Sequence, residues 1–143
     1  MTRAIAIRDC VKGKTRVAVS RRAQPLHPVV KEIAENLAGI DAIRFVRVTP
    51  GFLQASSEAS GARMLPVTKP GHPTAIGISL ITEEDREEIH FYEITSAVKG
   101  YGSRMVEAVL NALPKKWKAI VVMDWSDGFW KAMRRRHRRI VLL

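Results

Sequence analysis

Residues 88–113 read EIHFYEITSAVKGYGSRMVEAVLNAL, and the hydrophobic period changes halfway along them. From Glu88 to Ile94 apolar and polar residues alternate, which is typical of a strand. Further on, apolar residues recur at helical spacing and share one helix face: Met105, Val106, Val109, Leu110 and Leu113. Between the two patterns stand Gly100 and Gly102. The stretch therefore predicts a strand, a glycine loop and an amphipathic helix in direct succession.

A glycine loop in this position can bind an anion. The first N–H groups of a helix have no partner inside the helix, and a phosphate can approach them closely where Gly100 and Gly102 lack a Cβ atom. Lys99 and Arg104 add positive charge beside these amides. The third glycine of a dinucleotide-binding loop is missing, and so is the Gly-Lys-Ser/Thr of a P-loop. The loop thus predicts a phosphate site of another kind.

The sequence on either side of this stretch alternates between short strand patterns and two further helices. The acidic residues Glu83, Glu84 and Asp85 predict the tip of a hairpin, because a tip keeps like charges in water. Small polar residues over 54–61 predict a mobile loop, and residues 50–73 have no clear pattern. We expect strands over 4–8, 16–20, 43–48, 63–68, 74–82, 88–94, 118–123 and 140–143, and helices over 28–38 and 127–136.

Length and composition favour one globular domain over residues 1–143, since 46% of the residues are hydrophobic and 27% are charged. No apolar run is long enough for a membrane span, and the start lacks the core of a secretion signal, so a cytoplasmic protein is expected. Cys10 is the one cysteine and is more typical of a small apolar side chain than of a nucleophile. His27 and His72 adjoin prolines without ligand partners, so no metal site is predicted.

The net charge of +10 is concentrated near the end of the chain. A basic cluster attracts phosphate groups of a nucleic acid, an anionic membrane or a nucleotide cofactor, and it also suits a solvated helix end. Charge alone does not choose among these. The cluster comprises Lys131, Arg134, Arg135, Arg136, Arg138 and Arg139.

The stretch from Val98 to Ala108 resembles the acetyl-CoA signature of the GNAT superfamily of N-acetyltransferases, Gln/Arg-x-x-Gly-x-Gly/Ala at a strand-to-helix turn. The expected order of elements over residues 74–143 is also similar to that family. The resemblance implies an α/β fold with a mixed, mostly antiparallel sheet of about six to seven strands, helices on both faces, and central strands that splay to admit the pantetheine arm. It implies that acetyl-CoA is held by Ile94, Thr95, Val98, Lys99, Gly100, Tyr101, Gly102, Ser103, Arg104, Phe129 and Trp130.

The activity implied by this resemblance is transfer of an acetyl group to a primary amine, which attacks the thioester directly in a ternary complex. A general base is then required. Strand alternation is expected to put Glu93 on one face with Phe91, and His90 on the other with Tyr92 and Ile94. We assign Glu93 as the first candidate base and His90 as the second.

Two departures from the family pattern keep alternatives open. Ala97 stands where the family has Gln or Arg, and Phe129-Trp130 occupies the region of the tyrosine that protonates the leaving thiolate. Other hydroxyls, or water, would have to act as the acid: Ser126, Tyr92 or Tyr101. Ser126 or Asp127 is expected to cap the last helix, while its aromatic neighbours either line the acyl arm or pack in the core: Trp125, Phe129, Trp130 and Met133.

The alternatives to an enzyme are an inactive acyl-CoA-binding relative and a non-catalytic basic protein. The second would bind a nucleic acid or an acidic partner through the arginines of the basic cluster, Arg134, Arg135, Arg136, Arg138 and Arg139. The amine acceptor stays unassigned. A homodimer stays open as well.

Overall fold

A computed structural model describes residues 4–6 and 15–143 of the chain. The main strands are β1 (Ala4–Ala6), β2 (Arg16–Ser20), β3 (Phe45–Thr49), β4 (Phe52–Ser56), β7 (Ile76–Glu83), β8 (Glu88–Ser96), β9 (Lys118–Val121) and β10 (Ile140–Leu142). The short strands β5 (Ala59–Ser60) and β6 (Leu65–Pro66) form a separate hairpin. The helices are α1 (Pro28–Ala38), α2 (Tyr101–Ala112) and α3 (Phe129–Arg136). Cys10 and the last two residues of the strand predicted over 4–8 lie outside the described residues.

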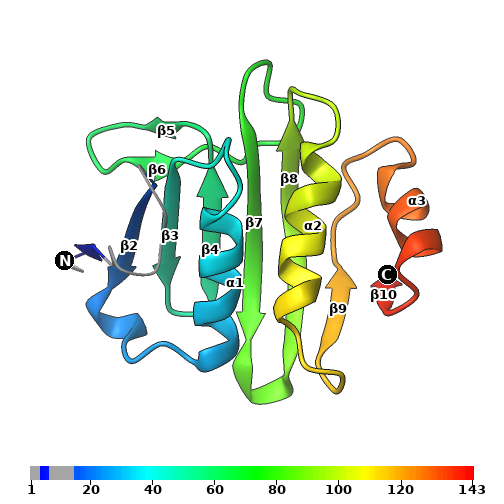
Figure 1. Cartoon of the computed structure of the whole chain (residues 1–143), viewed down its shortest axis with the longest axis horizontal. Coiled ribbons are helices and arrows are strands. Elements are labelled where there is room, and N and C mark those ends of the chain that lie inside the picture. The colour runs from blue at the N-terminus through cyan, green and yellow to red at the C-terminus, as the bar shows by residue number, and fades with distance from the viewer. Residues whose placement is uncertain (1–3, 7–14) are drawn as a thin grey trace.

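The main strands form one sheet in the order β1-β2-β3-β4-β7-β8-β9-β10 (Figure 1). The pairs β2–β3, β8–β9 and β9–β10 are parallel, and the other neighbours are antiparallel. The mixed, mostly antiparallel α/β architecture is therefore confirmed. The sheet has eight strands where six to seven were expected.

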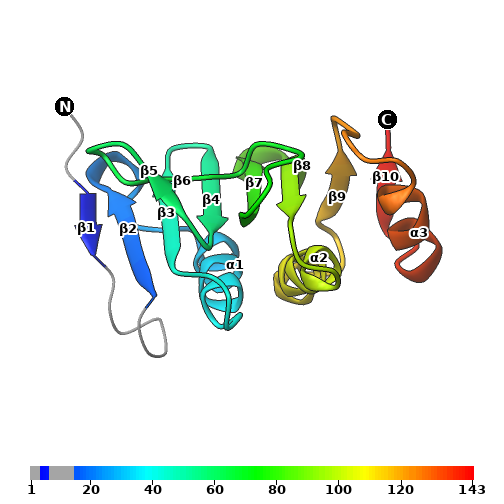
Figure 2. The ribbon, with the colours of Figure 1, turned by 90° about the horizontal axis from the view of Figure 1, so that it is seen from above.

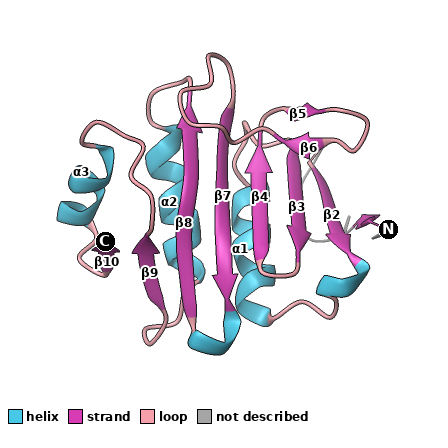
Figure 3. Ribbon diagram, turned by 180° about the vertical axis from the view of Figure 1, so that it is seen from behind, coloured by secondary structure: helices cyan, strands magenta, loops and turns pink. Residues whose placement is uncertain are grey.

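The helices lie on one face of the sheet, which we call the helix face (Figures 1 and 2). The β5–β6 hairpin crosses the other face, which we call the hairpin face (Figures 2 and 3). The prediction of helices on both faces is wrong. The connections β8–α2–β9 and β9–α3–β10 join parallel strands and advance the same way across the sheet, so the usual right-handed crossover puts α2 and α3 on one side, where α1 packs beside α2. None of the helices in the described residues is long and apolar enough to cross a bilayer.

Helix α1 has the bounds that its sequence predicts. Pro28 occupies its first turn, and Nδ1 of His27 accepts a hydrogen bond from the amide of Val29 at 3.1 Å. Ile33 and Leu37 are fully buried against the sheet, where α2 packs beside α1. The apolar stripes of these two helices and the helix face of the sheet thus share one core.

Strand β4 replaces the first part of the loop that was predicted over 54–61. Residues 52–56 pair with β3 on one side and with β7 on the other. Ala55 and Ser56 are completely buried. The small side chains of this segment give no strand signal in the sequence. Backbone hydrogen bonds to two neighbouring strands hold the segment in the sheet.

A β-bulge interrupts the pairing of β7 with β8. Ser79 faces Glu93 and Leu80 faces Phe91, which leaves Tyr92 as the extra residue. A bulge reverses the alternation of side chains beyond it. The predicted faces are therefore wrong after Tyr92, since Glu93 lies on the hairpin face like His90, and Ile94 turns toward the helix face.

Gly77 on β7 lies where the chain just after β6 crosses close to the sheet. A Cβ atom there would lie 2.4 Å from the carbonyl oxygen of Val67 and 3.1 Å from that of Ala55. We expect Gly77→Ala to lower the free energy of unfolding by about 1–3 kcal/mol, because two backbones would have to move apart. Gly39→Ala is the control, since its Cβ would be 3.4 Å from the nearest atom. Equal urea midpoints for the two variants, measured by circular dichroism, would contradict this close crossing.

Candidate functional site

Strands β8 and β9 stop pairing partway along β8. Their last partners in the ladder are Phe91 and Val121, and the amide of Val122 donates to the carbonyl of Phe91 at 3.3 Å. Strand β8 continues to Ser96, so residues 92–96 have no ladder with β9. The edge of β8 that faces β9 is thus free of strand pairing over this part.

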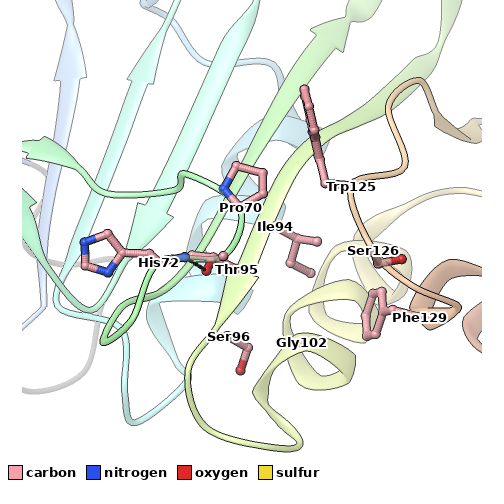
Figure 4. A pocket seen from close by; sticks show the side chains of 10 residues that line it. Pro70, His72, Ile94, Thr95, Ser96, Gly102, Trp125, Ser126 and Phe129 are labelled. Carbon is pink, nitrogen blue, oxygen red and sulfur yellow. Dashed lines mark hydrogen bonds between the residues drawn. The ribbon is translucent and has the colours of Figure 1, made fainter.

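A cavity of about 310 Å³ lies at this free edge (Figure 4). Three segments form its wall: the loop at 70–72, the end of β8 with the start of α2, and residues 125–129. The lining residues are Pro70, Gly71, His72, Ile94, Thr95, Ser96, Gly102, Trp125, Ser126 and Phe129.

The structure brings together part of the predicted site and adds a segment to it. Ile94, Thr95, Gly102 and Phe129 from the predicted cofactor set line the cavity, with Ser126 from the catalytic set. Sequence reasoning missed Ser96 and the loop at 70–72. The glycine and prolines near that loop indicate only a turn. The amide of His72 donates a hydrogen bond to Thr95 Oγ1 at 3.1 Å, and this link to β8 depends on the tertiary fold.

The loop before α2 carries a run of free backbone amides. Within the described part of the chain, no hydrogen bond is donated by the amides of residues 98–103, and the series resumes with the amide of Arg104, which donates to the carbonyl of Gly100 at 3.3 Å. Gly100 caps the helix with a φ of +97°, and no atom lies within 4 Å of the place where its Cβ would be. Val98, Lys99 and Gly100 are exposed, Tyr101 and Ser103 are half-buried, and Gly102, which is buried, lines the cavity. The loop therefore offers unpaired donors beside the cavity, as the glycine loop predicts.

Gly102 has a packing role in addition to the predicted one. A Cβ atom there would lie 3.1 Å from a ring carbon of Phe129, so Gly102 allows the first residue of α3 to pack against α2. Trp130 is 1% exposed, and its ring centroid lies 4.9 Å from that of Phe91 and 5.1 Å from that of Phe129. Trp130 therefore belongs to the core and not to the cavity wall. Met133 is buried as well.

Two side chains of the predicted phosphate site are engaged by Asp41, which precedes β3. The Tyr101 hydroxyl donates to Asp41 Oδ1 at 2.9 Å, and Arg104 lies 3.2 Å from the same oxygen. The Arg104 guanidinium also lies over the Tyr101 ring, 4.8 Å from its centroid. The Tyr101 hydrogen bond, with help from the charge of Arg104, lowers the pKa of Asp41. Lys99 and Val98 are exposed and Ser103 is half-buried.

The two candidate bases occupy separate places on the hairpin face. Glu93 Oε1 accepts hydrogen bonds from Thr68 Oγ1 at 2.8 Å and from Ser79 Oγ at 3.2 Å, and both hydroxyl residues are buried. His90 Nε2 lies 2.9 Å from Glu88 Oε1. That hydrogen bond is the main reason why the pKa of Glu88 is lowered. Neither candidate lines the cavity, but Glu93 shares a face with the lining residue Thr95.

Of the three candidate acids, Tyr101 is held by Asp41, and the other two, Tyr92 and Ser126, differ in their relation to the cavity. The Tyr92 ring packs edge-on against Phe52, with centroids 6.5 Å apart, and does not line the cavity. Ser126 does line it, and its hydroxyl donates to Asp124 Oδ1 at 2.6 Å. The cap of α3 is Gly128, with a φ of +99°, so the prediction of Ser126 or Asp127 as the cap is wrong. Asp124 instead holds the preceding turn, where it also accepts from the amide of Ser126.

The basic cluster is less free than its sequence indicates. Arg139 donates to the carbonyls of Leu113, Pro114 and Trp117, which closes the turn between α2 and β9. Arg136 pairs with Glu107 at 2.7 Å. The three remaining arginines of the cluster are exposed and form no salt bridge with any described residue: Arg134, Arg135 and Arg138.

No family model, curated protein or solved structure matches this chain. Over residues 4–6 and 15–143, no group of three or more His, Cys, Asp and Glu side chains is placed to hold a metal ion. The interpretation of the site therefore depends on its own geometry.

The Asp41 network predicts a defined pH response. Because the pKa of Asp41 is lowered in the folded state, the network stabilises the fold above the ordinary carboxyl pKa, and this stability is lost as the pH falls through the lowered value. Tyr101→Phe removes the main cause, so we expect the Asp41 titration, followed by NMR, to move toward a higher pH. Tyr92→Phe is the control and should leave it in place. An unmoved Asp41 titration in Tyr101→Phe would show that the hydrogen bond does not form in solution.

Proposed function

We propose that this chain is an acetyl-CoA-dependent N-acetyltransferase of the GNAT type, which transfers an acetyl group to a primary amine. The observation that carries the proposal is that the free amides of residues 98–103 directly follow the part of β8 where β8 and β9 have parted, with Gly102 in the wall of the cavity. A diphosphate fits these donors, and an extended arm fits the free edge of β8. A glycine loop without such a gap would support only an anion site.

The cavity suits a long, partly apolar ligand. Its volume of about 310 Å³ falls at the lower end of the range for small-molecule sites. Ile94, Phe129 and Trp125 give it an apolar wall. Ala97 provides no side chain for the diphosphate, so the backbone amides and the exposed Lys99 are its proposed partners.

The chemistry requires proton removal from the amine and a proton for the leaving thiolate. As the amine nitrogen bonds to the thioester carbon, the C–S bond breaks and Glu93 accepts the proton that the nitrogen loses. The buried hydroxyls of Thr68 and Ser79 orient this carboxylate. Ser126 is the candidate donor to the thiolate, because it lines the cavity. A thiol pKa of about 8.5 means that the thiolate needs little help to leave.

Ser103→Glu is the sharpest test of the amide site. It puts a carboxylate at the third position of α2, where the side chain can reach back to the free amides and complement the helix dipole. We expect the unliganded variant to melt at or above the wild-type temperature, and acetyl-CoA to lose its stabilising effect. In the wild type, a hundredfold excess over the dissociation constant adds about 2.7 kcal/mol to the stability. Differential scanning fluorimetry measures both quantities.

Ser103→Ala is the matched control, since it removes the hydroxyl without adding charge and should respond to acetyl-CoA like the wild type. If Ser103→Glu melted normally and acetyl-CoA still stabilised it fully, the ligand would have to bind elsewhere.

Glu93→Gln tests the assignment of the base. It keeps the size of the side chain and removes its ability to accept a proton, so we expect kcat for acetyl transfer to fall by about 10²- to 10⁴-fold, with little change in the affinity for acetyl-CoA. Release of the CoA thiol in the presence of a panel of primary amines measures the rate. His90→Gln is the comparison and should retain most of the activity. The reverse ranking of the two variants would move the base to His90.

The exposed arginines of α3 and the residues after it favour one alternative function, binding of a nucleic acid. Arg134, Arg135 and Arg138 have no salt-bridge partner among the described residues. Such binding would weaken steeply with salt, would be lost when these three arginines are neutralised, and would not respond to Ser103→Glu. An inactive acyl-CoA-binding protein would respond to Ser103→Glu but would show no amine-dependent thiol release.

A further inference from the structure

The Trp125 indole lies at the point where β8 and β9 stop pairing. Its Nε1 donates a hydrogen bond to the carbonyl oxygen of Tyr92 at 2.8 Å. Tyr92 directly follows Phe91, the last residue of β8 that pairs with β9. The indole therefore bridges the two segments at the point where they separate. Figure 4 shows Trp125 at one end of the cavity and Ser96 near the other.

The two ends of the cavity differ in chemistry. The glycine loop and its free amides lie at the end near Ser96 and Gly102. The free part of β8, residues 92–96, extends over roughly 13 Å at about 3.3 Å per residue. A donor whose diphosphate binds the amides, and whose arm follows this edge, directs its thioester and acyl group toward the Trp125 end.

Two anchors fix the position of the indole. The first is the hydrogen bond to the Tyr92 carbonyl, which holds the polar edge of the ring. The second is at the next residue: the amide and the hydroxyl of Ser126 donate to Asp124 Oδ1 at 2.9 Å and 2.6 Å. Turning the indole away would leave the Tyr92 carbonyl without this donor. Trp125 is nevertheless 48% exposed, so its side chain is a wall at the end of the cavity and not part of the core.

We propose that Trp125 closes the acyl end of the cavity and restricts the donor to short acyl chains such as acetyl. This inference rests on the proposed function, because it takes the cavity to be the acyl-CoA site. A longer acyl chain would have to displace an indole that two anchors hold. Removing the ring would open space for additional methylene groups, which are favourable to bury.

The test compares free CoA, acetyl-CoA, butanoyl-CoA and hexanoyl-CoA by calorimetric titration of the wild type, Trp125→Phe and Trp125→Ala. We expect the wild type to bind acetyl-CoA about tenfold or more tightly than hexanoyl-CoA, and Trp125→Ala to abolish or reverse this preference. The affinity for free CoA, which carries no acyl group, should change by less than about threefold in either variant. Trp125→Phe keeps a ring without the N–H group and should give an intermediate preference.

Titration with free CoA distinguishes failure of the proposed function from failure of the role proposed for Trp125. Binding of free CoA to Trp125→Ala also shows that this variant is folded. If neither free CoA nor acetyl-CoA binds the wild type, the proposed function fails and this inference fails with it. If CoA binds but the wild type does not discriminate by chain length, Trp125 is not the end wall. The inference is also overturned if both variants keep the wild-type preference.

Discussion

The site depends on the point at which β8 and β9 stop exchanging hydrogen bonds. The carbonyl of Phe91 accepts the last of them from Val122, and the bulge at Tyr92 changes the register of β8 immediately afterwards. A ladder that continued to Ser96 would use the edge of β8 and leave no space for the cavity. Because α2 begins just beyond the end of β8, the same interruption puts a free strand edge beside the free amides of a helix.

Several residues that resemble ligand contacts in the sequence also make contacts that hold the fold together. Gly102 makes room for Phe129, and Arg139 closes the turn after α2. Arg104 is shared with Asp41, which limits its freedom to reach a phosphate. The backbone amides of the loop therefore become the main donors of the candidate site. Because Arg104, Arg136 and Arg139 have partners within the protein, the net charge of +10 overstates the positive charge that is free to bind a ligand.

The sequence predicts most elements with a strong period and fails where tertiary contacts decide. Helix α1 and strand β2 have their expected bounds, because their hydrophobic spacing or alternation is unbroken. Strand β4 was missed, since its small side chains carry no signal and its neighbours hold it through the backbone. The bulge at Tyr92 leaves no mark in the alternation, so the face of Glu93 was assigned wrongly. The cavity wall at 70–72 and the wall formed by Trp125 depend on contacts between segments far apart in the chain.

Amide chemical shifts measured while acetyl-CoA is added test the central claim most directly, because each free donor reports separately. The account predicts that the largest changes occur at the amides of Gly100, Tyr101, Gly102 and Ser103, with smaller changes along residues 92–96. The amide proton resonances of these four residues should shift downfield, as expected for hydrogen bonds to a phosphate oxygen. Changes confined to Arg134, Arg135 and Arg138, with the loop amides unmoved at saturation, would contradict it.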